Sequence, residues 1–183
     1  MKYIFYFDDV LFYTTRRRNE HLYPFLEKLG IKHGEIDEYY KKMRGNKFSM
    51  ENLLKHFSLD KKFYREIMGG SKSFLNIELI KIVEKIGKES CCIITYGDKK
   101  FQLDKIKSTG IASLFSKIIV VTTDEKKKII EKICAKYKNE KIVFIDDKIK
   151  HLENIDFKKC SNLKTILYDG KGLQKLVAEV QKD

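Results

Sequence analysis

The sequence lacks several features that would point away from a soluble globular protein. It has no apolar run of about 18 residues, the length that a membrane-spanning helix needs, so we expect no membrane contact. Its basic, aromatic N-terminus has no small-residue cleavage site of a signal peptide, and we therefore expect a cytoplasmic protein. Low-complexity linkers and internal repeats are also absent. The 183 residues, 43% of them hydrophobic and 35% charged, suit one folded domain, with or without a small inserted cap.

Cysteine is scarce and is not arranged for metal binding. The four cysteines, at positions 91, 92, 134 and 160, contain no C-x-x-C pair. Two of them lie in a segment with the pattern of a core strand. This usage favours reduced, buried thiols over disulfides or zinc ligands.

Positive charge is abundant, with a formal net charge of +12. Such a balance can indicate a polyanionic partner such as nucleic acid. Most of the lysines, however, are scattered through helical patterns and form no single stripe. The pattern therefore favours solvated helix faces, and a nucleic-acid partner is the less favoured interpretation.

Residues 2–14 are the most informative stretch of the chain. They run from an apolar, aromatic segment into Asp8 and Asp9 and out again into a second apolar segment. This pattern predicts a buried strand that brings carboxylates to its carboxyl end, the edge at which open α/β sheets bind ligands. Because charged side chains are almost never buried alone, acids at this position need a cation, a proton or a ligand.

The rest of the chain predicts an α/β fold with a helical insertion. Residues 15–72 have helical periodicity without strand signals, which predicts a small helical subdomain. From Leu75 onward, helical stripes alternate with apolar strands, which we place at residues 91–95, 117–122, 142–145 and 165–167. Strands separated by helices of about ten residues predict a doubly wound, Rossmann-like parallel sheet.

The first strand resembles the first motif of the haloacid dehalogenase (HAD) superfamily of phosphotransferases. The common form of that motif is an apolar strand followed by Asp-x-Asp-Gly-x-Leu-x-Asp-Thr. Laid on residues 5–14 without gaps, the match covers Phe5, Phe7, Asp8, Val10, Leu11, Phe12 and Thr14. Tyr6 stands where the family has its nucleophilic aspartate, Asp9 where it has glycine, and Tyr13 where it often has a further aspartate. The resemblance makes Asp8 the general acid/base.

Two further motifs of this superfamily have counterparts that would hold a phosphoryl group. Residues 91–98 resemble the second motif, an apolar strand followed by a hydroxyl residue, one residue and glycine, here Thr95, Tyr96 and Gly97. Taken alone, this is also an ordinary exit from a strand. The third motif is a lysine near the start of a helix, for which Lys126 is the choice because of its spacing to the apolar residues that follow. Its role would be to neutralise the phosphate and the carboxylates.

The fourth motif corresponds to Asp146 and Asp147 at the end of an apolar strand. Adjacent carboxylates repel unless a cation lies beside them, and hard oxygen ligands suit magnesium. Capping of the following helix is the alternative role of these acids. The resemblance implies a magnesium site at Asp8, Asp146 and Asp147, with Asp147 as a direct ligand and Asp8 contributing its backbone carbonyl.

The resemblance also implies a division of the chain and a loss of chemistry. Residues 1–14 and 73–183 would form the HAD-like core, and residues 15–72 a helical cap with Arg16, Arg17 and Arg18 at its hinge. Those arginines also suit a solvated basic turn. Tyr6 has a neutral phenol near pH 7 and supplies neither a carboxylate nucleophile nor a hard anionic ligand. We therefore expect magnesium to bind weakly at best.

Three functions follow as hypotheses. The first is a catalytically impaired or non-catalytic HAD-like hydrolase that keeps a cleft for phosphate or metal and binds a small phosphorylated molecule. The second is an active magnesium-dependent phosphohydrolase acting on a small phosphomonoester. The third is a basic nucleic-acid-binding module, whose binding would weaken steeply with salt.

Overall fold

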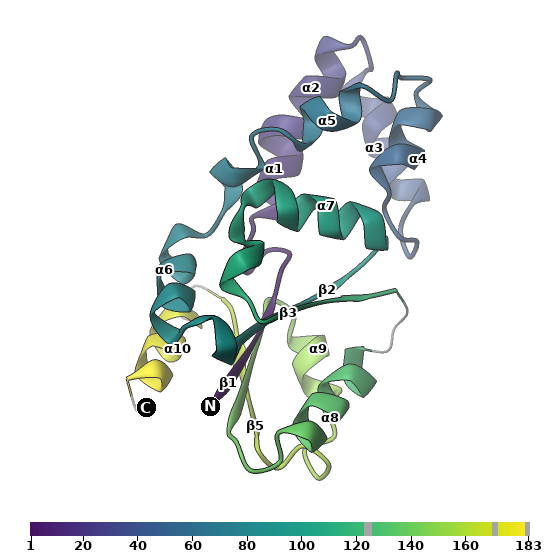
Figure 1. Ribbon diagram of the computed structural model, residues 1–183. Helices are drawn as coiled ribbons and strands as arrows, with labels where there is room; N and C mark the ends of the chain where they lie inside the picture. Colours follow the sequence, from purple (N-terminus) through teal and green to yellow (C-terminus); the bar gives the residue numbers. More distant parts are fainter. Residues whose placement is uncertain (123–125, 170–171, 182–183) are drawn as a thin grey trace.

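The computed structural model describes residues 1–122, 126–169 and 172–181. Within these ranges, five strands form one parallel sheet in the order β3-β2-β1-β4-β5 (Figure 1). The strands are β1 (Lys2–Tyr6), β2 (Cys91–Tyr96), β3 (Lys117–Val121), β4 (Ile142–Asp146) and β5 (Leu163–Leu167). The predicted α/β class with a parallel, Rossmann-like sheet is confirmed.

Two of the inner strands, β1 and β4, are apolar at nearly every position because both of their faces are covered. All five residues of β4 are buried, as are four of the five residues of β1. A strand with one wet face would instead alternate apolar and polar residues. The burial of β4 extends to Asp146, so a carboxylate ends this strand inside the protein.

Helices follow the strands and cover the sheet. They are α6 (Ile77–Ile86), α7 (Lys99–Thr109), α8 (Lys126–Lys136), α9 (Ile149–Glu153) and α10 (Gly172–Val180), with short 3₁₀ turns at Ser71–Phe74, Lys88–Ser90 and Ile111–Leu114. In Figure 1, α6 and α10 lie on one side of the sheet and α8 and α9 on the other. Asn76 and Asp98 cap α6 and α7, because their side chains accept hydrogen bonds from the backbone N–H groups of Leu79 and Phe101.

The chain between β1 and α6 is helical and has its own apolar cluster. Its elements are α1 (Thr14–Arg17), a π-helical turn (Arg18–Leu22), α2 (Tyr23–Lys28), α3 (His33–Lys42), α4 (Met50–His56) and α5 (Phe63–Met68). Their buried residues form a cluster separate from that of the sheet, joined from outside the segment by Phe101 of α7. In Figure 1 these helices lie beyond α7, away from the sheet. The boundary at residues 15–72 stays a prediction.

Two smaller observations complete the architecture. All four cysteines are free thiols, with Cys92 partly exposed and the other three buried. None of the helices in the described ranges has the length and apolar character needed to cross a membrane.

Candidate functional site

Three neighbouring strands bring polar side chains to one edge of the sheet. Tyr6 ends β1, which lies between β2, ending at Tyr96, and β4, ending at Asp146. Tyr6 is only 5% exposed, and its pKa is raised first by burial and then by the charges of Asp8, Asp146 and Asp147. The phenol is therefore neutral at any physiological pH, and all three predicted acids lie close enough to influence it.

The loop after β1 contains a residue with left-handed backbone geometry. Asp9 has φ +56°, at the position where the resembling motif has glycine. Asp and Asn adopt this conformation more readily than other residues with side chains. The Asp9 carboxylate also accepts hydrogen bonds from the backbone N–H and the hydroxyl of Thr15, each at 2.9 Å. Asp9 thus replaces a glycine while holding the start of α1.

The Asp8 carboxylate is fully engaged by the protein. Lys105 and the Thr14 hydroxyl donate to Oδ1, while the Thr95 hydroxyl and the Gln102 amide donate to Oδ2 at 3.1 and 3.2 Å. Burial alone would raise the pKa of Asp8, but Lys105 and the hydrogen bonds outweigh it and lower the pKa. Burial lowers the pKa of Lys105, and the neighbouring Asp8 carboxylate opposes this shift. Because several donors hold Asp8 as an anion, we take the pair as ionised.

Lys105 and Gln102 are site residues that the sequence analysis missed. Lys105 is 2% exposed, and its ammonium lies 5.2 to 5.7 Å from the ring centroids of Phe7, Phe12 and Phe101. The signal was the spacing within α7, where the buried positions are 101, 102, 105, 106 and 109. A lysine and a glutamine therefore fall on the inward face of the helix, and polar groups on such a face need partners.

A second ion pair lies on the other side of Tyr6. The Lys126 Nζ is 3.8 Å from the centroid of the Tyr6 ring and 3.5 Å from Oδ2 of Asp146. His151, which the sequence analysis also missed, donates from Nδ1 to Asp146 at 2.9 Å. Burial would raise the pKa of the fully buried Asp146, but His151, Lys126 and the Lys148 backbone N–H lower it. Lys126 was the predicted lysine, and it does lie at this edge.

Asp147 differs from its neighbour. Burial and the nearby charge of Asp146 raise its pKa to about 6, although Lys148 opposes the shift. Its Oδ1 is buried and has no hydrogen-bond partner in the described part of the chain. Asp147 is therefore the predicted acid that the protein leaves least satisfied.

Two cavities flank this edge, and Tyr96 lines both. One, of about 540 Å³, is lined by Tyr6, Tyr96, Lys126, Lys127, Lys148, Lys150, His151 and Asn154; we call it the basic cavity. The other, of about 270 Å³, is lined by Asp8, Gln102 and Lys105 together with residues of the helical segment; we call it the inner cavity. Of the predicted site residues, Asp8 and Gly97 line the inner cavity, Tyr6 and Lys126 line the basic cavity, and Tyr96 lines both. Thr95, Asp146 and Asp147 line neither.

The remaining residues of the second motif support Asp8. Thr95 is fully buried, and its hydroxyl is used by Asp8. Gly97 makes room for Gln102, because a Cβ at Gly97 would lie 2.8 Å from the Gln102 Nε2. That nitrogen also donates to the Tyr96 carbonyl at 3.0 Å. In this structure these two residues position other side chains, while Tyr96 and Lys126 are the predicted phosphate contacts that line the basic cavity.

The donor set does not fit magnesium. Asp8 is held by Lys105, and Asp146 is held by Lys126 and His151. A metal ion would have to displace the buried Lys105 and the partly buried Lys126, and each ammonium would then lose its counter-ion. Over the residues that the structure describes, no group of three or more His, Cys, Asp or Glu side chains is arranged to hold a metal ion. Lysine ammonium groups therefore lie next to Asp8 and Asp146, where a metal ion would have to bind.

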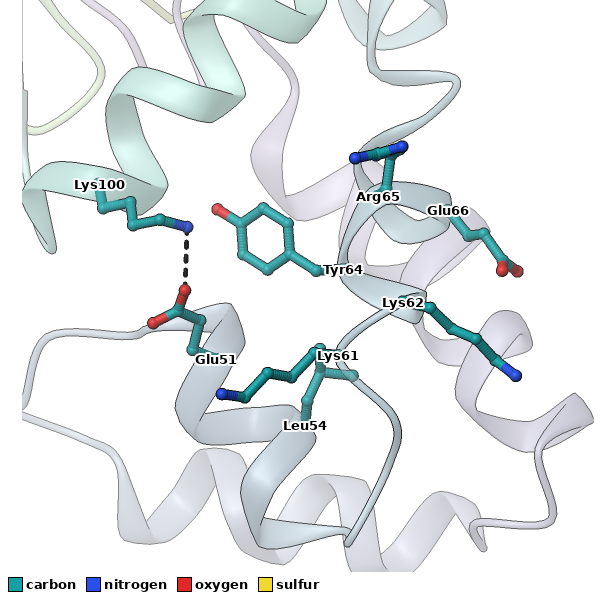
Figure 2. A pocket seen from close by; sticks show the side chains of 8 residues that line it. All are labelled: Glu51, Leu54, Lys61, Lys62, Tyr64, Arg65, Glu66 and Lys100. Carbon is teal, nitrogen blue, oxygen red and sulfur yellow. Dashed lines mark ion pairs between the residues drawn. The ribbon is translucent and has the colours of Figure 1, made fainter.

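A further cavity lies away from the sheet edge, between α4, α5 and the start of α7 (Figure 2). Its volume is about 690 Å³, and it carries charges of both signs. Lys100 forms a 2.9 Å ion pair with Glu51 and lies 4.4 Å from the centroid of the Tyr64 ring. In Figure 2, Lys62 and Glu66 point away from this pair. Because the charged side chains that line it are exposed, we assign no site there.

Comparison with known proteins gives a likeness of fold. No family model and no curated protein matches the sequence. A protein of Burkholderia xenovorans described as a haloacid dehalogenase-like hydrolase is 15% identical, with a TM-score of 0.69 over 94% of this chain and 89% of its own. YfnB of Bacillus subtilis, described as a HAD-type hydrolase bound to magnesium, is 14% identical, with a TM-score of 0.62 over 98% of this chain and 97% of its own. A hydrolase of Streptococcus pneumoniae is 15% identical, with a TM-score of 0.55 and 97% coverage of both chains. The chain therefore has the fold of the haloacid dehalogenase-like hydrolases.

Proposed function

We propose that this protein is a HAD-like relative that binds a small phosphorylated molecule in the basic cavity and does not hydrolyse it. The observation that carries the proposal is Tyr6, which stands where the resemblance places the nucleophilic aspartate. Covalent phosphoryl transfer needs an activated nucleophile. The Tyr6 phenol has a raised pKa, and its ring faces the Lys126 ammonium. A neutral, buried phenol is a poor nucleophile.

The acid/base function is also suppressed. Asp8 would have to exchange a proton with the leaving group in the family's reaction. Here its pKa lies below the ordinary value, and both of its oxygens accept hydrogen bonds from buried donors. A general acid or base works best with a pKa near the working pH. Asp8 thus acts in this proposal as the counter-ion of Lys105.

Binding is still supported by the charge of the basic cavity. Lys126, Lys127, Lys148 and Lys150 line it, and Asp146 already forms an ion pair with Lys126 and a hydrogen bond with His151. The cavity therefore has an excess of positive charge that suits a phosphate dianion. Clusters of cationic donors bind phosphate through charge-assisted hydrogen bonds without a metal ion. The helical residues 15–72 would act as a cap over the neighbouring inner cavity.

The test combines a binding measurement with an activity measurement on the full chain. Calorimetric titration with inorganic phosphate is expected to show binding that does not depend on magnesium and is at least fivefold weaker in Lys126→Met. Lys107→Met is the matched control, because Lys107 is exposed on α7 and lines neither cavity. Hydrolysis of generic phosphomonoesters is expected to stay at background with and without magnesium.

Two outcomes would overturn the proposal. Magnesium-dependent turnover by the unaltered protein, abolished by Asp8→Ala, would establish an active phosphohydrolase. Phosphate binding that is equally strong in Lys126→Met would place the anion elsewhere. The variant Tyr6→Asp adds a carboxylate to the site, and we expect it to bind magnesium more tightly than the unaltered protein does.

A further inference from the structure

The basic cavity contains three lysines that have no acidic partner in the described part of the chain. Of its four lysines, Lys126 is the one paired with an acid, since its Nζ lies 3.5 Å from Oδ2 of Asp146. Over residues 1–122, 126–169 and 172–181, no ion pair joins Lys127, Lys148 or Lys150 to an acid, and no acidic side chain lines the cavity. The hollow therefore holds three ammonium groups that an anion can compensate.

Two of these lysines are close enough to repel each other. Burial is the largest cause that lowers the pKa of Lys126; Asp146 opposes it, and the charge of Lys148 lowers the pKa further. A nearby like charge disfavours the charged form of a group. An anion that reaches both ammonium groups would relieve this repulsion, so the cavity suits more negative charge than Asp146 supplies.

The cations reach the cavity from two separate helices. Lys126 and Lys127 are the first two residues of α8, while Lys148 directly precedes α9 and Lys150 lies in its first turn. In Figure 1, α8 and α9 lie on the same side of the sheet. The amino end of an α-helix carries a partial positive charge, which adds to the potential on the α8 side. The cavity thus has two groups of cations, one from each helix.

The cavity is larger than a single phosphate group requires. Its volume of about 540 Å³ lies within the usual range for ligand pockets, about 300 to 1,000 Å³. A phosphate group has the size of a few water molecules, each of which takes about 30 Å³ in the liquid, so it would leave most of this space empty. The volume therefore suits a small molecule with more than one anionic group.

The charges in the cavity match two phosphate groups better than one. A phosphate monoester carries about −1.5 to −2 charges at pH 7. One such group would leave at least one of the three unpaired lysines uncompensated. Two groups, at roughly −3 to −4 charges, would compensate all three.

We infer that the ligand of the basic cavity carries two phosphate groups, one held by Lys126 and Lys127 of α8 and the other by Lys148 and Lys150 beside α9. This inference rests on the proposed function and narrows the class of ligand. A diphosphate and a small molecule with two separate phosphate groups share the chemistry that these lysines recognise, and the experiment includes both.

The test compares anions by calorimetric titration of the full chain without magnesium. The probes are inorganic phosphate, methylenediphosphonate as a diphosphate that cannot be hydrolysed, and fructose 1,6-bisphosphate as a molecule with two separate phosphate groups. Citrate is the control, because it carries several negative charges and no phosphate. At least one of the two double-phosphate probes is expected to bind at least tenfold more tightly than inorganic phosphate, and citrate is expected to bind no more tightly than inorganic phosphate. The tighter of the two probes identifies how the phosphate groups are spaced.

Charge variants test which lysines hold the second phosphate group. The double variant Lys148→Met/Lys150→Met should reduce the tenfold advantage over inorganic phosphate to below threefold. The matched control is Lys107→Met/Lys158→Met, which removes the same charge from exposed lysines that do not line the cavity. This control variant should keep the tenfold advantage.

The outcomes separate this inference from the proposed function. Phosphate binding that depends on Lys126, with neither double-phosphate probe binding tenfold more tightly, would overturn the inference and leave the proposed function standing. The same holds if citrate binds as tightly as the double-phosphate probes, or if their advantage survives in Lys148→Met/Lys150→Met. No saturable binding of any phosphate compound at millimolar concentration would overturn both.

Discussion

Removing the ammonium of Lys105 should destabilise the protein through Asp8. In Lys105→Met, the apolar stem can still pack among Phe7, Phe12 and Phe101, while the carboxylate stays buried without its cation. Breaking a buried ion pair from one side costs about 3 to 5 kcal/mol. Three donors to Asp8 remain, the two threonine hydroxyls and the Gln102 amide, so we expect the low end, about 3 kcal/mol.

The cost should depend on pH with a defined sign. In the unaltered protein the pKa of Asp8 is lowered, so its stabilisation is present above the unfolded value of about 3.9 and is lost as the pH falls through the lowered pKa. In Lys105→Met, burial raises the pKa of Asp8 instead. The penalty is then fully present at pH 7 and shrinks as the pH falls toward 4, because the acid becomes protonated.

Urea unfolding at pH 7 and pH 4 measures this penalty, with Lys107→Met on the same helix as the control. At roughly 2 to 4 °C per kcal/mol for a chain of this size, the melting temperature should fall by about 6 to 12 °C at pH 7. Adding Asp8→Asn to Lys105→Met should recover more than half of the loss, because an amide carries no charge. A cost below about 1 kcal/mol at pH 7, or no recovery in the double variant, would refute an ionised Lys105–Asp8 pair.

Further predictions concern the acids at the edge and the core of the helical segment. Asp147→Asn should raise the free energy of unfolding by about 1 kcal/mol at pH 8 and leave it unchanged at pH 4, because the raised pKa of Asp147 penalises its ionised form only above the pKa of the unfolded chain. Equal gains at both pH values would contradict this. Asp9→Ala should lower the free energy of unfolding by about 1 to 2 kcal/mol, and Asp9→Gly by less, since glycine tolerates φ +56°. A higher melting temperature for the alanine variant than for the glycine variant would argue against the strained turn. Leu53→Ala should lower the same free energy by about 2 to 5 kcal/mol in urea unfolding, because Leu53 is fully buried in the cluster of the helical segment; a loss below about 1 kcal/mol would show that the cluster is loosely packed.

Much of the candidate site was predictable because strands carry their end residues to a common edge. Lys126, Tyr6 and Asp146 could be placed from apolar runs and the order of the motifs. Helical spacing places Lys105 on an inward face but does not identify its partner, because its contact with Asp8 joins positions 97 apart in the chain. His151 lies only five residues after Asp146, and the two meet through the short turn between β4 and α9. Neither residue belongs to a sequence motif whose spacing predicts a role for it.

The sequence by itself determined the parallel sheet, since β1 and β4 are buried on both faces and must be apolar throughout. It also determined that Tyr6 supplies no carboxylate. It did not predict α3, which buries only Ile36 and Tyr39 and so has little apolar periodicity. Only the tertiary structure decided which charges are paired, because burial and partners depend on packing between distant segments. Arg16 and Arg17 are adjacent and chemically identical, yet one meets solvent and Glu20 while the other is enclosed beside a cavity.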